Sequence, residues 1–266
     1  MSDLTVSPTA PPRPAAHLND ALTMIVRSIR LSNRNVDALL TSVILPVMIM
    51  LLFVYLFGGA IETGFDTYVN YVVPGVLLLC TGFVSALTAS GVTQDMRESI
   101  IDRFRSMDVS GAAVLTGHVA ASAVRNIVST VIVVLVALLI GFRPTAGPLE
   151  WLAAAGVLAM FVLAVSWAAA AFGLVARTPE GAGGFSFFVM FLPYPSSAFV
   201  PVETMPTWMH GFAEHQPATP VIETLRGLLM GTPIGNSAWL AIAWCAAITV
   251  VAVVAVGALY RHRTGT

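Results

Sequence analysis

Few residues of this chain have side chains that could do chemistry, and they are scattered. A Gly184-Phe185-Ser186 tripeptide opens an apolar stretch, as a nucleophilic serine site would. A serine nucleophile needs a base within hydrogen-bonding distance, and no histidine lies in a later apolar stretch, so we interpret these residues as a flexible start to a helix. Cys80 and Cys245 lie within apolar runs and lack the spacing of a metal or redox pair. We therefore predict no catalytic residue, no metal site and no cofactor bound by this chain.

The basic residues narrow the function further, because all 13 are arginine and no lysine occurs. Without lysine the chain cannot form a phosphate-binding GxxxxGK[ST] loop or a Schiff base. The chain itself is therefore not a P-loop ATPase. A formal net charge of −1 also argues against nucleic acid as a partner.

The composition indicates which elements must position these residues. Of the 266 residues, 57% are hydrophobic and 10% are charged, and the mean hydropathy is +0.84. Soluble domains are typically about 45–50% apolar and about 25% charged, so the excess apolar surface has to face lipid. We predict an all-α membrane protein.

Six apolar stretches are predicted to be transmembrane helices. Most approach the ~20 residues needed to cross the hydrocarbon core. They cover residues 39–57, 72–89, 119–142, 151–176, 185–200 and 239–260. The fifth is the shortest and contains Pro193 and Pro195, so we expect it to be broken or to continue into the segment after it.

Together these stretches form a six-helix transmembrane domain over residues 36–262. A proline-rich tail at 1–16 is expected to be disordered. Residues 17–35 have the pattern of an amphipathic helix with a cluster of arginines on one face. We expect this helix to lie in the membrane interface, and a helix packed on a soluble partner is the alternative.

The arginines orient the helices, because cytoplasmic loops carry an excess of basic residues. Ten arginines fall in the N-terminal region, the second and fourth loops and the C-terminal tail, namely Arg13, Arg27, Arg30, Arg34, Arg97, Arg103, Arg105, Arg177, Arg261 and Arg263. The opposite loops carry only Arg143 and Arg226. We predict a multi-pass membrane protein with both termini in the cytoplasm.

Charge inside the predicted spans is almost absent. Arg125 is the one charged residue within them, about two turns from the cytoplasmic end of its span. Intramembrane charge is often functional, but this position favours a side chain that snorkels to the inner interface. No Asp or Glu occurs in the six stretches. Ion-driven carriers use intramembrane carboxylates or unwound ion sites, so we expect the energy source to lie outside this chain.

The predicted cytoplasmic loop at residues 94–111 has the pattern of an amphipathic helix. Ile100, Phe104 and Met107 share one side, and most of the charged residues lie elsewhere. A helix of this kind between two spans suits the docking of a soluble partner. A helix lying on the inner membrane face is the alternative.

The predicted outer segment at residues 196–231 contains two short helices, at about 206–214 and 220–230. Proline suits the first turn of each helix, Thr219 is placed to cap the second, and Gly231 is placed to end it. Helices this apolar are expected to dip back into the outer leaflet, shielded by protein.

Charged and apolar side chains of this segment have separate expected roles. Glu223 and Arg226 are three residues apart and can pair. Glu203 is interpreted either as a gate residue or as an exposed loop carboxylate. The apolar faces of the two helices comprise Met205, Trp208, Met209 and Phe212 on the first and Ile222, Leu225 and Leu229 on the second.

These two segments resemble the permease subunits of ABC-2 type transporters, and most closely the daunorubicin-resistance branch of bacterial drug exporters. The matching residues are IIDRFRSM at 100–107, AVLTG at 113–117 and SSAFVPVETMPTWMHGFAEHQPATPVIETLRGLLMG at 196–231. With the six spans, the N-terminal helix and the length, the resemblance covers nearly the whole chain after residue 16.

The resemblance implies two groups of functional residues. The cytoplasmic helix would couple to an ATPase subunit through Asp95, Arg97, Glu98, Ile101, Asp102, Arg103 and Phe104. The outer short helices would line the extracellular exit, with an outer gate formed by Glu203, Trp208, Phe212, Glu223 and Arg226.

The resemblance also implies a function and partners. We expect the membrane half of an exporter in a bacterial plasma membrane that moves amphipathic drugs, lipids or secondary metabolites out of the cell. Two permease chains, identical or related, would form the pathway within the membrane lipids, and separate ABC ATPase subunits would hold ATP and Mg²⁺ and supply the energy. The alternatives are a polysaccharide or teichoic-acid exporter permease, and a membrane scaffold or assembly factor that transports nothing.

Overall fold

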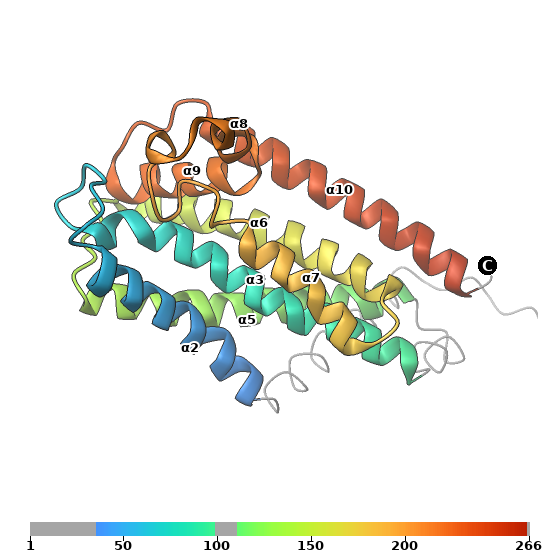
Figure 1. Cartoon of the computed structure of the whole chain (residues 1–266). Helices are drawn as coiled ribbons and strands as arrows, with labels where there is room; N and C mark the ends of the chain where they lie inside the picture. The colour runs from blue at the N-terminus through green and yellow to red at the C-terminus, as the bar shows by residue number, and fades with distance from the viewer. Residues whose placement is uncertain (1–35, 99–110, 265–266) are drawn as a thin grey trace, which may run out of the picture.

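The structure, a computed structural model, describes residues 36–98 and 111–264. All regular structure in these ranges is helical (Figure 1), which confirms the all-α prediction for this part of the chain. The predicted tail at 1–16, the predicted interfacial helix at 17–35 and most of the predicted amphipathic loop lie outside the described residues.

Five helices of the described ranges are long and apolar enough to cross a membrane. They are α2 (Val36–Leu52, continued by the π-helical turn η1, Phe53–Phe57), α3 (Tyr68–Arg97), α5 (Gly111–Leu139), α6 (Pro148–Val175) and α10 (Ser237–Thr264). Each includes most or all of one of the predicted stretches. Because α3 has 30 residues, it is about 45 Å long at 1.5 Å per residue. It therefore extends beyond a hydrocarbon core of about 30 Å.

The predicted span at 185–200 is the one that is not among these five. The chain forms α7 (Pro179–Phe191), which has 13 residues, and then continues in turns. Thr178 caps α7 through its Oγ1, which accepts a backbone N–H at 3.1 Å. The helix ends just before Pro193 and Pro195, which lack the N–H that the next helical turn needs. At about 20 Å, α7 is too short to cross the core by itself.

Three short helices follow this break, η2 (Val202–Thr204), α8 (Thr207–His215) and α9 (Ala218–Met230). The prediction of two short helices is confirmed, with shifts of one or two residues, and Gly231 ends α9 with a φ of 72° as predicted. The predicted cap at Thr219 is wrong. Since α9 already begins at Ala218, Thr219 lies inside its first turn, and its hydroxyl donates to the carbonyl of Ala213 in α8.

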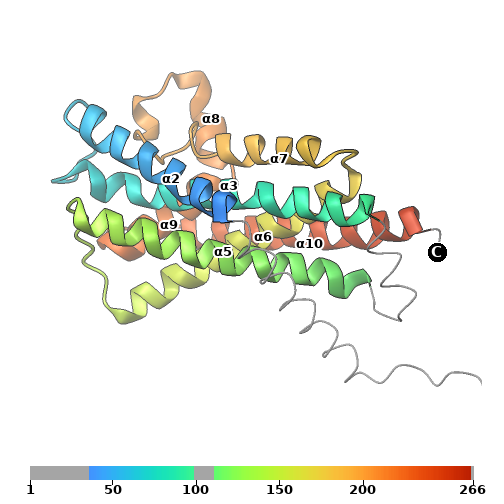
Figure 2. The ribbon, with the colours of Figure 1, turned by 90° about the horizontal axis from the view of Figure 1, so that it is seen from below.

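The helices are arranged around α3, the most buried of the five long helices. Seen from below, α7 and α8 lie on one side of α3 and α5 lies on the other (Figure 2). The short helices α8 and α9 gather at one end of the bundle, here called the outer end. The last turn of α3, the start of α7 and the C-terminal end of α10 lie at the opposite end, here called the inner end (Figure 1).

Small residues allow other segments to approach the α3 backbone closely. A Cβ added to Gly75 would lie 2.5 Å from the Cβ of Ala198, and one added to Gly82 would lie 3.0 Å from the Cα of Met190. The first distance is too short for a side chain, so the contact at Gly75 requires glycine, and a side chain at Gly82 would force the backbone at Met190 to shift by a few tenths of an ångström. Close approach of this kind is how helices associate in lipid, where the hydrophobic effect does not drive them together.

Candidate functional site

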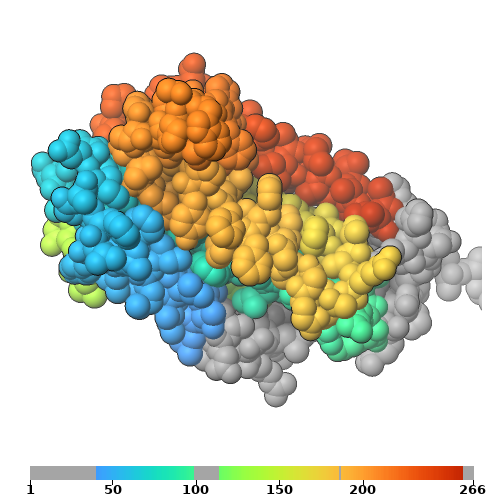
Figure 3. All heavy atoms as spheres, in the orientation of Figure 1, coloured from blue at the N-terminus to red at the C-terminus, as the bar shows by residue number. Residues whose placement is uncertain are grey.

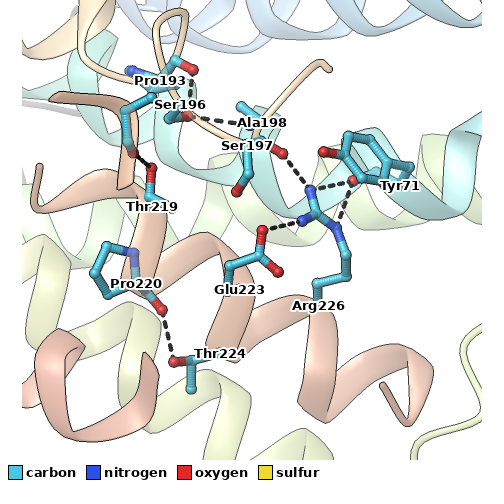
Figure 4. A network of polar contacts seen from close by, with 11 residues as sticks. Tyr71, Pro193, Ser196, Ser197, Ala198, Thr219, Pro220, Glu223, Thr224 and Arg226 are labelled. Atoms are coloured by element: carbon cyan, nitrogen blue, oxygen red, sulfur yellow. Dashed lines mark hydrogen bonds and ion pairs between the residues drawn. The ribbon is translucent and has the colours of Figure 1, made fainter. Parts of the chain in front are cut away.

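The outer end is organised around the guanidinium of Arg226, in α9. Its Nη1 donates to Glu223 Oε1 at 2.7 Å, and its Nη2 donates to the carbonyl oxygens of Ser197 at 2.6 Å and Tyr71 at 3.1 Å. The Nε also reaches the Tyr71 carbonyl at 3.3 Å, and the guanidinium carbon lies 3.8 Å from the centre of the Tyr71 ring. Figure 4 shows these contacts converging on one side chain.

This network joins three segments that are far apart in the sequence. Tyr71 lies in the first turn of α3, Ser197 in the turns after α7, and Arg226 in α9. The Arg226 side chain is 4% exposed, whereas that of Glu223 is 36% exposed. The predicted pairing of Glu223 with Arg226 is confirmed. A buried arginine is tolerated here because its charge is paired and its donors are used.

The turns at residues 192–200 are held by two further side chains. The amide nitrogen of Gln216 donates to the carbonyls of Leu192 and Pro195, each at 2.9 Å. The hydroxyl of Tyr68 donates to the carbonyl of Phe199 at 2.6 Å. Buried backbone outside regular helices needs partners for its polar groups, and Gln216, Tyr68 and Arg226 supply them.

The structure divides the predicted outer gate into two groups. Glu223 and Arg226 belong to the buried network. Glu203 in η2 and Trp208 and Phe212 in α8 are exposed on the surface of the outer end, with Trp208 80% and Phe212 57% exposed. The apolar face predicted for α9 is buried, whereas that predicted for α8 is largely open.

At the inner end, the predicted ATPase-coupling residues are also separated. Asp95 is buried near the end of α3, and one of its carboxylate oxygens lies 3.0 Å from Nε2 of His118 in α5. Arg97 and Glu98 are exposed, and Gln94 donates to the Glu98 carboxylate. Asp95 therefore joins two helices of this chain instead of facing outward with its neighbours.

The other four predicted coupling residues lie outside the described residues, namely Ile101, Asp102, Arg103 and Phe104. The segment that contains them connects α3 to α5, and the Asp95–His118 pair joins these two helices next to the connection. The pair fixes the spacing of the two helices from which the predicted coupling helix extends.

Arg125 lies between these two ends, in the middle of α5. It is buried, and its Nη2 donates to Thr88 Oγ1 of α3 at 3.1 Å. The predicted snorkelling to the inner interface is therefore wrong. Nearby, Ser166 of α6 donates to Ser122 of α5 at 2.8 Å. Arg125 and Ser122 thus connect α5 to α3 and to α6 through polar contacts within the bundle.

Metal-binding and nucleophilic side chains do not form a centre in the described ranges. No group of three or more His, Cys, Asp or Glu side chains that could hold a metal lies within residues 36–98 and 111–264. Cys80 in α3 and Cys245 in α10 are both buried as free thiols on separate helices. The polar groups of the site therefore act by holding backbone and by spacing helices.

Two cavities lie among the helices. One, of about 330 Å³, lies between α5, α6 and α9 and is lined mainly by aliphatic side chains. The other, of about 520 Å³, lies between α6, α7, α8 and α10, and its lining includes four phenylalanines and a tryptophan. Both volumes are within the range of small-molecule sites in proteins, which is about 300–1,000 Å³.

Several residues of the outer and inner sites were missed by the sequence reasoning. Tyr68 and Gln216 hold the turns at 192–200, Tyr71 accepts from Arg226, and His118 is the partner of Asp95. One signal was present for Gln216, because a segment broken by two prolines leaves carbonyls that a polar neighbour must satisfy.

Comparison with known proteins identifies a family and relatives to which this chain is similar. Residues 20–230 match the family model of the ABC-2 type transporter. The chain is 32% identical, over 83% of its length and 78% of the relative's, to the "Daunorubicin resistance ABC transporter permease protein DrrB1" of Streptomyces coeruleorubidus. It is 24% identical, over 98% of its length and 96% of the relative's, to the "Probable doxorubicin resistance ABC transporter permease protein DrrC" of Mycobacterium tuberculosis.

Proposed function

The chain belongs to the ABC-2 type transporter family, and from this premise we propose that it is the permease subunit of an ATP-driven exporter that moves amphipathic drugs, lipids or secondary metabolites out of a bacterial cell. The observation that carries the proposal is the family match, which covers the four long helices α2, α3, α5 and α6 and both short outer helices. The two relatives are named for resistance to daunorubicin and doxorubicin, which supports amphipathic drugs as cargo.

The energy for transport comes from a separate subunit. The chain has no lysine and so cannot form the phosphate-binding loop of an ATPase. We therefore assign ATP, Mg²⁺ and hydrolysis to ABC ATPase subunits that bind at the inner end. The arginine-rich loops and tails support a cytoplasmic position for this end and for both termini.

The contact with the ATPase is assigned to the connection between α3 and α5. Arg97 and Glu98 are exposed at the end of α3, and Ile101, Asp102, Arg103 and Phe104 follow directly in the sequence. Asp95 supports this contact indirectly, because its pair with His118 holds the two flanking helices together. Closure of the ATPase subunits on ATP would push this connection and move α3 and α5.

The transport pathway is assigned to the space between two permease chains, identical or related, within membrane lipids. Large apolar side chains are exposed along α2, α5, α7 and α10, which supports contact with lipid or with a second permease. The buried outer network and the exposed outer group, Glu203, Trp208 and Phe212, would surround the extracellular exit.

Purification with the ATPase tests this function. The chain should copurify with an ABC ATPase from its own cells, and ATP hydrolysis by that ATPase in lipid vesicles should rise when the chain is present. Hydrolysis that does not depend on the chain would indicate a scaffold and contradict the proposal. Stimulation by added polysaccharide precursors, but not by amphipathic drugs, would indicate the polysaccharide exporter instead.

A double substitution tests the coupling contact. Asp102→Arg with Phe104→Ala should abolish the chain-dependent part of hydrolysis, because it reverses a charge and removes a ring on the proposed contact. Glu62→Ala, at an exposed position in the connection between η1 and α3 that is given no role in transport, is the control and should leave hydrolysis unchanged. If the double variant stimulates hydrolysis as the wild type does, the coupling assignment fails.

A further inference from the structure

The cavity between α6, α7, α8 and α10, here called the aromatic cavity, has been given no ligand so far. Figure 3 shows the face on which these helices border one another, with α8 in orange, α7 in gold and α10 in red. Five rings line the cavity, namely Phe161, Phe185, Phe188, Phe212 and Trp244. Phe161 is 2% exposed and forms a deep wall, whereas Phe188 and Phe212 are exposed at the mouth. The cavity is therefore open to the side of the helix bundle.

The chemistry of this cavity differs from that of the cavity between α5, α6 and α9. Among the described residues that line the aromatic cavity, none is Asp, Glu, Arg or Lys. In the second cavity, Trp151 is the one aromatic residue among the described lining residues, and the other apolar residues are aliphatic. Flat rings gain from stacking against aromatic walls in addition to the burial of apolar surface. The aromatic cavity is thus better suited to a planar molecule than the aliphatic one.

Gln216 adds a polar requirement to this site. Its amide nitrogen donates to Leu192 and Pro195, so the side-chain orientation is fixed with Oε1 on the other side of the amide. Gln216 lines the cavity and is 5% exposed, and its Oε1 has no hydrogen-bond partner among the described residues. A buried amide oxygen without a partner is costly, and a ligand that carries an N–H or O–H group would supply one.

We propose that this cavity binds a planar, fused-ring amphiphile that carries a hydrogen-bond donor, which enters laterally from the membrane between α7 and α10. The proposal rests on the proposed function, because it treats the bound molecule as cargo of the exporter. It narrows the cargo from amphipathic molecules in general to rigid aromatic ones. The site lies beside the turns at 192–200, so a bound molecule contacts the same Gln216 that holds those turns.

Binding of the planar dye rhodamine 6G tests the proposal, because this dye has fused rings and N–H donors. The full chain in lipid nanodiscs is titrated by fluorescence anisotropy, with empty nanodiscs as the background. Ala168→Phe fills the aromatic cavity and should weaken binding by about tenfold or more. The matched control is Ala159→Phe, which adds the same ring to the aliphatic cavity and should leave binding unchanged.

A second pair of variants removes a wall of the cavity without adding bulk. Phe188→Ala should weaken rhodamine binding by roughly threefold to tenfold. Phe187→Ala changes the neighbouring exposed phenylalanine of α7, which does not line the cavity, and should bind as the wild type does. Both side chains are more than half exposed, so neither change should prevent folding.

The outcomes separate this inference from the proposed function. If Ala168→Phe and Phe188→Ala bind rhodamine 6G normally while ATP-driven uptake continues, the site is wrong and the exporter function stands. If the variants weaken binding but the wild-type complex shows no ATP-driven uptake of any amphiphile, the site stands and the exporter function fails. If Ala168→Phe converts a dimeric chain to a monomer in light scattering, the cavity belongs to an interface between copies and the inference is overturned.

Discussion

At the outer end of the bundle, buried side chains hold irregular backbone, whereas at the inner end side-chain contacts join regular helices, among them the Asp95–His118 pair between α3 and α5. Arg226, Gln216 and Tyr68 donate to carbonyls of the turns that follow α7. At the inner end, Asp95 and His118 are each partly accessible, with side-chain exposures of 12% and 14%. The outer end thus has several buried polar contacts on one irregular segment. At the inner end, polar contacts join helices instead, since Thr93 and Ser90 of α3 also donate to the carbonyls of Gly173 in α6 and Pro179 in α7, each at 2.8 Å.

This difference shows how the same bundle can serve two purposes. Buried and multiply bonded charge is costly to disrupt, so the outer segment should keep its shape when the helices move. The inner contacts join whole helices, and the Asp95–His118 pair lies beside the connection that we assign to the ATPase. We infer that movement starts at the inner end and reaches the outer end as a displacement of whole helices.

The largest effect is expected from Arg226→Ala. This change leaves Glu223 and the carbonyls of Tyr71 and Ser197 without their shared donor, and breaking a buried charge network costs about 3 kcal/mol or more. Thermal unfolding of the purified chain in detergent should show a fall of many degrees in Tm. Arg226→Lys retains the charge but loses the planar guanidinium, so its Tm should lie between those of the wild type and the alanine variant. If the alanine variant had the wild-type Tm, the outer network would not stabilise the fold, and the contrast between the outer and inner ends would fail.

A smaller effect at the same end is expected from Gln216→Leu. The change removes two hydrogen bonds to the turns at 192–200, each worth about 1 kcal/mol. Amide hydrogen exchange in this segment should become faster, while exchange in α5 stays as it is. Glu214→Leu, on an exposed neighbouring position of α8, is the control. Unchanged exchange in the glutamine variant would show that the turns are held by other contacts.

A still smaller effect on stability is expected at the inner end, from Asp95→Asn and His118→Ala. Each should lower the free energy of unfolding by about 1 kcal/mol, because each breaks the Asp95–His118 contact while the other contacts between the inner helices remain. Each should nevertheless reduce chain-dependent ATP hydrolysis, and the double variant should be no worse than either single one. If the losses of ATP hydrolysis in the two single variants added up in the double variant, the two residues would act separately and not through their shared contact.

The smallest effect on folding is expected from Trp208→Ala in α8. This ring is 80% exposed, so its removal should change the free energy of unfolding by less than about 0.5 kcal/mol. If α8 lies in the outer leaflet interface, as the sequence predicts, bromine-labelled lipid should quench the wild-type tryptophan fluorescence more strongly than that of the variant. Equal quenching would place α8 outside the lipid.

The sequence was most informative where composition and proline positions decide the structure. Long apolar runs predict helices because backbone groups in lipid must be satisfied internally, and five long helices lie at predicted positions. Pro193 and Pro195 predicted a break in the span at 185–200, and α7 ends just before them. The spacing of Glu223 and Arg226 predicted their pairing, because side chains three residues apart on a helix are neighbours.

Contacts between distant segments could not be predicted in this way. The partners of Arg125, Asp95 and Gln216 lie on other elements, and the pairing depends on how the helices pack and on where their small residues fall. The position of Arg125 in its predicted span suggests only a side chain that snorkels to the inner interface. Its contact with Thr88 exists because α3 and α5 pack side by side at that depth.

The central claim is that this chain is a conduit powered by a separate ATPase, and ATP-driven uptake into inverted membrane vesicles tests it most directly. Vesicles that contain the chain and its ATPase should accumulate doxorubicin when ATP is added. Accumulation should persist when a proton uncoupler collapses the membrane potential, and it should stop with a hydrolysis-deficient ATPase. Accumulation that survives loss of hydrolysis, or that stops with the uncoupler while ATP is still hydrolysed, would contradict the account.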